Sequence, residues 1–312
     1  MTELPLVDLV GVGLNATDTI LSLPAFPERG SKIQYSHAHI LPGGQTASAV
    51  IACQAWGLTT RYVGKLGDDD AARLHQREFE RAGVDARIVT VPDARSPQSL
   101  ILVDGGGERT VLNLREDRLL LQPEDLQREW IVRARALHVD GLETAAATQA
   151  ASWARAAGIP VIADLDELYP GVEDLLANID YLIVSRNFPA LVTGERSLEQ
   201  ALRRMKRRYG CAVAAATLGE EGVLAWDGSR FHLRPAYRVD VTDTTGAGDI
   251  FHAGFIYGLL KGWPLEQQLD FACAAAALNC TASGARGGIG PAERVEALMA
   301  SAPRHAPAPV AN

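Results

Sequence analysis

The 312-residue sequence has few of the features that mark secreted, membrane-bound or metal-binding proteins. Its four cysteines, Cys53, Cys211, Cys273 and Cys280, form no C-x-x-C pair and no metal-ligand spacing, so we interpret them as buried thiols. No run reaches the ~18 apolar residues of a membrane span, and the N-terminus lacks a charged-then-apolar signal pattern. The net charge of −8 argues against a nucleic-acid surface, which needs a clustered basic excess. We therefore expect a cytoplasmic protein whose partners include neither nucleic acid nor membrane.

Two common nucleotide-binding motifs are also missing or incomplete. The G-K pair at 64–65 is followed by Leu66, where a P-loop needs Ser or Thr. Residues 11–16 match the dinucleotide fingerprint, but that fingerprint needs a helix at its glycines, and the segment that follows contains Pro24 and Pro27. Phosphate handling is therefore assigned to another part of the chain.

The most informative segment is 243–249, Asp-Thr-Thr-Gly-Ala-Gly-Asp, which runs into a helix-like stretch. Gly246, Ala247 and Gly248 let backbone N–H groups converge where the helix begins, and a helix start carries partial positive charge and unsatisfied donors. Asp249 falls in the first helical turn, beside this anion site. The pattern predicts phosphoryl transfer, with these amides as anion hole and Asp249 as general base. A simple helix-terminal charge, worth about 0.3–1 kcal/mol, is the alternative for Asp249.

This segment resembles the C-terminal signature of the PfkB, or ribokinase-like, carbohydrate kinases. Residues 43–49, followed by 64–69, resemble their N-terminal signature, and 217–222 resembles their nucleotide-binding T-x-G-x-x-G. The resemblance extends over roughly residues 5–300. It implies an enzyme that uses ATP and Mg²⁺ to transfer the γ-phosphate to a primary hydroxyl of a small sugar.

Short apolar runs alternate with longer amphipathic segments, as is typical of a mostly parallel sheet covered by helices. We expect strands at 6–12, 61–63, 136–139, 161–164, 181–184 and 212–217, and helices at 46–56, 70–82, 144–157 and 197–209, each followed by a glycine. Segments 32–41 and 99–114 alternate in hydropathy without a helical partner, which indicates an antiparallel flap. Together with the resemblance, this predicts an α/β ribokinase-like three-layer sandwich with a small antiparallel β lid.

The expected organisation is a kinase domain over 1–300, with a lid from about 14–42 and 96–115, and a Pro/Ala-rich disordered tail over 301–312. The resemblance implies that the lid covers the sugar. Because an uncovered flap favours pairing through its edge, we expect a homodimer through the lid.

The resemblance places the sugar beside several segments of the N-terminal half. Asp18 stands where the family has an aspartate that binds sugar hydroxyls, and Asn15 lies near it. Gly43 and Gly44 let a sugar approach a helix entrance, and Ser48 replaces an asparagine of many members with a shorter hydrogen-bonding group. The residues alone also allow a turn capped by Asp18 and a plain helix-entry turn at the glycines.

The resemblance assigns the nucleotide to Asn187, Thr217, Gly219, Gly222 and Asn279, together with the amides of the 246–248 corner. Ala190 stands where the family usually has a glutamate that orders water around magnesium, although such metals are held chiefly by waters and phosphates. Residues 217–222 are equally compatible with a hairpin turn. Finally, the resemblance implies a monovalent cation such as K⁺ at Asp243, Thr245 and Gly284.

Segments 96–104, 107–109 and 243–253 look most like the 6-deoxy-6-sulfofructose kinase branch, in which residues at the positions of Lys32 and Asn113 face the anionic end of the sugar. An arginine of that branch is missing near His138, so a neutral sugar is an alternative, and Lys32 also fits an ordinary solubilising role. Kinases for 2-keto-3-deoxygluconate, fructose, ribose or nucleosides are further alternatives. So is a non-catalytic sugar- or nucleotide-binding regulator.

Overall fold

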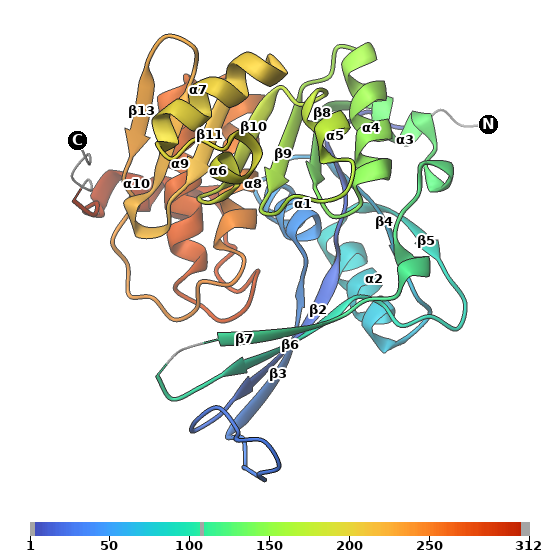
Figure 1. The fold of residues 1–312 in the computed structure, drawn as a ribbon. Coiled ribbons are helices and arrows are strands. Elements are labelled where there is room, and N and C mark those ends of the chain that lie inside the picture. The colour runs from blue at the N-terminus through green and yellow to red at the C-terminus, as the bar shows by residue number, and fades with distance from the viewer. Residues whose placement is uncertain (1–3, 107–108, 307–312) are drawn as a thin grey trace.

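A nine-stranded sheet runs through the main domain, and a smaller sheet projects from it (Figure 1). The computed structural model describes residues 4–106 and 109–306. The strands of the large sheet are β1 (Val7–Val12), β4 (Thr60–Leu66), β5 (Asp85–Thr90), β8 (Ala134–Asp140), β9 (Val161–Leu165), β10 (Tyr181–Ser185), β11 (Val213–Thr217), β12 (Val223–Trp226) and β13 (Phe231–Arg234). Their order is β13-β12-β11-β10-β9-β8-β1-β4-β5, in which β12 runs antiparallel to both of its neighbours, β11 and β13, and all other neighbouring strands are parallel. The predicted mostly parallel central sheet is confirmed.

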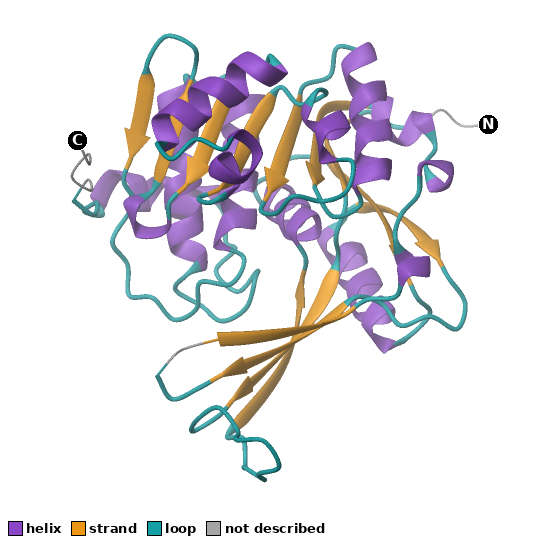
Figure 2. Ribbon diagram, viewed as in Figure 1, coloured by secondary structure: helices purple, strands orange, loops and turns teal. Residues whose placement is uncertain are grey.

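Helices cover both faces of this sheet (Figure 2). One face carries α3 (Arg128–Val132), α4 (Thr144–Ala156), α5 (Val172–Leu176), α6 (Phe188–Thr193) and α7 (Leu198–Tyr209). The other carries α1 (Gln45–Ala55), α2 (Asp70–Ala82), α8 (Ala247–Leu260), α9 (Leu265–Asn279) and α10 (Ala292–Ser301). Three short 3₁₀ turns are η1 (Asp117–Leu119), η2 (Pro123–Asp125) and η3 (Gly219–Glu221). Within the part of the chain that the structure describes, no helix is both long and apolar enough to cross a bilayer.

The central strands β9, β10 and β11 are largely apolar because each is covered by helices on both faces. In β9, Val161 and Ala163 join the core beneath α4, whereas Ile162 joins the core beneath α8 and α9. Alternate side chains of a strand point to opposite faces, so a strand between two helical layers needs apolar residues at every position. These two cores hold the carboxyl ends of the parallel strands at one edge of the sheet, where the loops toward the lid begin.

The lid is a four-stranded sheet of β2 (Ala16–Ser22), β3 (His37–Gly43), β6 (Gln98–Val103) and β7 (Arg109–Leu114), in the order β3-β2-β6-β7. Two of the three pairings are antiparallel, as expected of the flap, and the central pairing of β2 with β6 is parallel. The reason is the connection: β2 and β6 are joined through elements of the main domain instead of by a hairpin. Both strands therefore leave that domain in the same direction.

The C-terminal segment is more ordered than its composition indicates. The helix α10 continues to Ser301, and Arg304 then bonds the Pro235 carbonyl at 2.8 Å and pairs with Asp270 at 2.6 Å. Its guanidinium also lies 4.1 Å from the centroid of the Tyr237 ring. Residues 302–306 thus differ from the expected disordered tail because one arginine finds partners that are distant in sequence. Residues 307–312 lie outside the described residues.

Candidate active site

The predicted glycine corner opens α8. Gly246 is the residue that caps the helix, with φ of 73°, and a β-carbon there would lie 2.3 Å from the Ala285 carbonyl oxygen. Only glycine fits this left-handed, crowded position. The Ala247 amide donates to the Thr244 carbonyl at 3.3 Å, so the exposed Gly248 and the residue after it provide the helix-start donors that remain.

Asp249 lies half-buried in the first turn of α8, as predicted. Burial and the neighbouring Asp164 raise the pKa of its carboxyl to about 7, while His252 and Arg286 act in the opposite direction. The His252 Nδ1 atom lies 2.8 Å from the Gly248 carbonyl oxygen and 3.3 Å from Asp164 Oδ2. A carboxyl with a pKa near neutrality is suited to accept a proton from a substrate and release it again.

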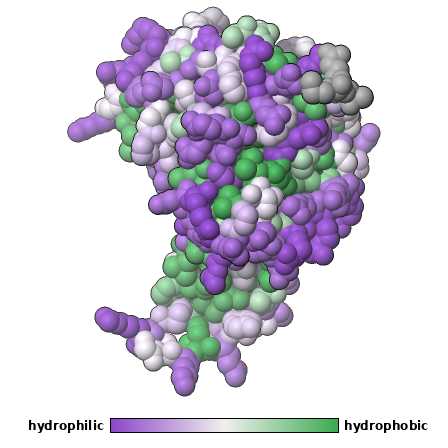
Figure 3. All heavy atoms as spheres, turned by 90° about the vertical axis from the view of Figure 1, so that its right-hand side faces the viewer, coloured by the Kyte–Doolittle hydropathy of each residue, from purple (hydrophilic) through white to green (hydrophobic). Residues whose placement is uncertain are grey.

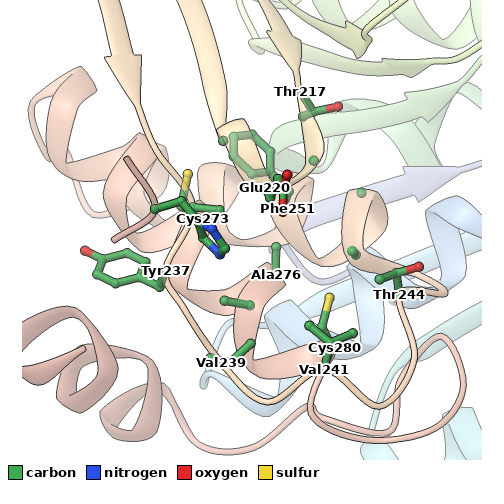
Figure 4. Close-up of a pocket in the computed structure, with 17 residues that line it drawn as sticks. Thr217, Glu220, Tyr237, Val239, Val241, Thr244, Phe251, Cys273, Ala276 and Cys280 are labelled. Atoms are coloured by element: carbon green, nitrogen blue, oxygen red, sulfur yellow. The ribbon is translucent and has the colours of Figure 1, made fainter. Parts of the chain in front are cut away.

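A cavity of about 460 Å³ lies beside this corner (Figure 4). Its walls include Thr217, Gly219 and Gly222 of the β11–β12 turn, and Ala247 and Gly248 of the helix start. The predicted hairpin and the predicted phosphate corner therefore share one cavity. Its remaining lining comes mostly from apolar side chains, including Tyr237, Val239, Phe251, Ala276 and Cys280.

Two further residues assigned to the nucleotide lie outside that lining. Asn187 is exposed at the start of α6, on whose surface Ala190 also lies. Asn279 is fully buried, and its Nδ2 atom donates to the carbonyls of Thr245 and Ala285 at 3.1 Å each. Its amide therefore holds two loops of the site together.

The three residues assigned to a monovalent cation are adjacent. Asp243 accepts hydrogen bonds from the amide of Thr245 at 2.9 Å, from its hydroxyl at 2.7 Å, and from the Gly284 amide at 2.8 Å. These contacts shape the loop that precedes the glycine corner. Within residues 4–106 and 109–306, no group of three or more His, Cys, Asp or Glu side chains is arranged to hold a metal ion.

The predicted sugar residues meet where the lid joins the main domain. Asp18 is buried on β2, and a β-carbon at Gly43 would lie 2.3 Å from its carboxylate. Gly44 has φ of 94°, and a β-carbon there would lie 2.6 Å from the Asn15 Cα atom. Burial and the nearby Asp243 raise the pKa of Asp18. The glycine pair is therefore required by close backbone and carboxylate contacts as well as by the turn.

The lid places Asn113 and Lys32 differently. Asp18 pairs with Ser99, and Ser99 pairs with Asn113, so these side chains share one face of the lid. Lys32 lies in the exposed connection between β2 and β3, and the four residues of β2 that follow Asp18 already span about 13 Å along the strand. Within one chain, Asn113 shares the face of Asp18, whereas Lys32 lies at the far end of the lid.

Sequence reasoning missed two residues that contact the predicted sugar segments or their neighbours. Arg286 is buried in the loop before α10 and bonds the Gly43 carbonyl and Ser48, which is itself fully buried. Asp166 follows β9 and accepts hydrogen bonds from Gln45 at 3.3 Å and Tyr169 at 3.0 Å. The carboxyl ends of parallel strands were the available signal for Asp166, since ligands bind at that edge of open α/β sheets.

The fold and this two-part site are those of a kinase for small molecules, and comparison with known proteins identifies the family. The model of the pfkB family carbohydrate kinases matches residues 1–290. An ATP-dependent ribose-1-phosphate kinase of Halopiger xanaduensis is 28% identical over 90% of this chain and 94% of its own length. An aminoimidazole riboside kinase of Salmonella typhimurium is 30% identical over 78% of this chain and 83% of its own.

The structure of Arabidopsis thaliana ribokinase complexed with ribose and ATP superposes with a TM-score of 0.81 at 24% identity, and covers 94% of this chain and 99% of its own. The chain belongs to the PfkB family of carbohydrate kinases and has the ribokinase-like fold. It is a sugar or nucleoside kinase. The sulfofructose branch is not confirmed, because these relatives carry the names of other substrates.

Proposed function

We propose that the protein transfers the γ-phosphate of ATP to a primary hydroxyl of a small sugar bound beneath the lid. The observation that carries this proposal is the position of Asp249. It follows Ala247 and Gly248, which line the nucleotide cavity, and its charge interacts with Arg286, which contacts the acceptor loop at Gly43. One carboxylate therefore borders both halves of the site.

The reaction follows from this arrangement. The acceptor hydroxyl gives its proton to the Asp249 carboxylate as its oxygen bonds to the γ-phosphorus, and the bond to the β-phosphate oxygen breaks, which releases ADP. Charge on the transferred group is stabilised by the helix-start amides after Gly246. Asp249 returns its proton to solvent after the product leaves.

The cavity beside the glycine corner fits a nucleotide, since it joins apolar walls to backbone donors at a helix start. Mg²⁺ would be held mainly by the nucleotide phosphates and water, so Ala190 does not remove it, and it would neutralise charge between the β- and γ-phosphates. Asp243, Thr245 and Gly284 are proposed to hold K⁺ through the loop they form.

A neutral acceptor is favoured over sulfofructose. Asp18 and Asp249 both lie close enough to interact electrostatically with Arg286, and this buried arginine is already hydrogen-bonded to protein atoms. Lys32, the cation expected to meet a sulfonate, lies at the far end of the lid. We therefore expect ribose, fructose and nucleosides to be better acceptors than anionic sugars.

An ADP-release assay tests the proposal with ribose, fructose, 2-keto-3-deoxygluconate, sulfofructose and adenosine, each in KCl and in NaCl. Turnover of at least one acceptor, lost in Asp249→Asn, supports a kinase. Sugar binding by calorimetry without turnover in the wild type would instead identify a regulator.

The lid is also proposed to form a homodimer. Its outer face carries exposed apolar side chains, including Ile40, Leu112 and Leu114, and Figure 3 shows apolar side chains gathered on the lid where it projects from the main domain. Cross-strand pairing places Ile40, Thr19, Leu100 and Leu112 in one row. A second copy of this face would cover the row.

A further inference from the structure

We propose that Arg286 positions the acceptor-binding wall by fixing Asn15, Gly43 and Ser48, a role that rests on the proposed function. These three residues come from the β1–β2 connection, β3 and α1, whereas Arg286 lies in the loop between α9 and α10. A single side chain therefore joins segments that are far apart in sequence at the point where the sugar is expected.

The guanidinium uses its donors on different acceptors. Its Nε atom donates to Ser48 Oγ at 3.1 Å, and its Nη2 atom donates to the Gly43 carbonyl at 2.5 Å and to Asn15 Oδ1 at 3.4 Å. Its Nη1 atom pairs with Glu78 of α2. The planar fork of arginine suits this set of fixed directions, which an ammonium group cannot reproduce.

The contact with Asn15 determines which end of that amide is available. Arginine has donors only, so the Asn15 oxygen must face it, and the Nδ2 donor must point elsewhere. Asn15 is only 2% exposed, and its Nδ2 atom has no hydrogen-bond partner among the described residues. A buried donor without a partner is costly, and a sugar hydroxyl would satisfy it. Asn15 would then donate to the sugar, while the nearby Asp18 accepts from it.

Ser48 makes room for this arrangement. Its short side chain is fully buried against the guanidinium, where an asparagine, the residue of many family members, would occupy space that Arg286 fills. Ser48 therefore serves the site through Arg286 and does not reach the sugar itself. Ser48 and Arg286, which come from different segments, together take the place of that single asparagine.

Glu78 keeps the guanidinium in place, and this complicates a single substitution. The Arg286 and Glu78 side chains are only 5% and 12% exposed, so removal of one leaves the other buried and unpaired. The test variant is therefore the double substitution Arg286→Gln with Glu78→Gln. The matched control is Arg61→Gln with Asp85→Asn, because Arg61 is also buried, pairs with Asp85 at 2.7 Å and bonds the Trp130 and Pro5 carbonyls, away from this site.

The experiment compares KM for the acceptor with KM for ATP, using ribose, fructose and adenosine in turn. Loss of these charged hydrogen bonds predicts an acceptor KM raised about 10- to 100-fold in the Arg286/Glu78 variant, with KM for ATP within about twofold. The Arg61/Asp85 control lowers Tm and leaves both KM values unchanged. Asn15→Asp, which replaces the free donor by a carboxylate, should raise the acceptor KM, and its effect should be less than additive with Arg286→Lys.

Unchanged acceptor KM in the folded double variant, or equal increases for sugar and ATP, would overturn the role of Arg286 and leave the kinase assignment intact. If the double variant does not fold, the double-mutant cycle of Asn15→Asp and Arg286→Lys tests the proposal instead. Fully additive effects of the two substitutions on the acceptor KM would count against it. A wild type that neither binds nor phosphorylates any of the acceptors would defeat the proposed function, and the acceptor wall with it.

Discussion

The two halves of the site are assembled in different ways. All residues that line the proposed nucleotide cavity lie between Thr217 and His305, within one continuous third of the chain. The proposed acceptor wall of Asn15, Gly43 and Ser48, together with Arg286 and its partner Glu78, draws on segments that are far apart in the sequence. The nucleotide half is therefore a local motif on a packed helix, whereas the acceptor half depends on tertiary contacts and on a lid. This difference suggests how substrate preference can change in such a protein while the phosphate corner stays the same.

The largest effect is expected at the residue that borders both halves. Asp249→Asn should lower kcat by about 10²- to 10⁴-fold, because the amide cannot accept the hydroxyl proton, while ATP binding is retained. Steady-state kinetics with ATP binding by calorimetry measures both. A loss of less than tenfold would show that another group is the base.

The nucleotide half can be disrupted by substituting a glycine whose backbone conformation and surroundings exclude a side chain. Gly246→Ala should lower the free energy of unfolding by about 1–3 kcal/mol and weaken ATP binding, since the residue has positive φ and a β-carbon would clash with Ala285. Gly248→Ala is the control, because nothing lies within 4 Å of its β-carbon position. Thermal unfolding of the two variants makes the comparison, and equal losses would contradict the steric explanation.

The pH dependence tests the electrostatics at the junction. Burial and Asp164 raise the pKa of Asp249 to about 7, and the ionised form is the active one. Activity should therefore be full above this pKa and fall as pH decreases through 7, by about tenfold per pH unit on the acid side. A kcat/KM profile for the free enzyme measures it. A profile that stays flat down to pH 5 would be inconsistent with this base.

The proposed dimerisation through the lid can be tested separately from the chemistry of the main domain. Leu112→Asp should convert the proposed dimer to monomer, because a charge on the exposed apolar row opposes its burial. Leu191→Asp is the control, since Leu191 is similarly exposed on α6. Sedimentation velocity gives the oligomeric state, and a wild-type monomer would remove the lid dimer from the proposal.

The smallest effect is expected at Lys32. Because Lys32 lies at the exposed end of the lid, the substitution Lys32→Ala should change KM for a neutral sugar by less than about twofold. The same assay with sulfofructose provides the contrast. A tenfold increase of KM for sulfofructose alone would restore the anionic sugar as the natural acceptor.

The comparison also explains which predictions were possible from sequence. The strand and helix predictions of the main domain were confirmed, and helix 70–82 was correct at both ends, because hydrophobic periodicity and a glycine after the helix are local signals. The strand β2 was not predicted, since Pro24 and Pro27 follow it closely and its neighbours β3 and β6 come later in the chain. The parallel pairing of β2 and β6 had no local signal at all.

The same holds for individual side chains. Asp249 and its glycines were predicted because chemistry and backbone requirement fall within seven residues. Arg286 lies two residues after Gly284, which was assigned to a cation, but an arginine in a loop gives no sign of which carbonyls it will meet. Asn279, assigned to the nucleotide, also holds two loops together, which its sequence position did not indicate.

The amino-acid sequence by itself determined the layered sheet, the helix that begins at a glycine corner, and the carboxylate in its first turn, because each depends on residues that are neighbours in the chain. Only the tertiary structure decided that a buried arginine from the end of the domain orients an asparagine from its beginning, and that lid strands from separate segments run parallel. Contacts of this kind depend on which surfaces the two cores bring together, and no short stretch of residues encodes them.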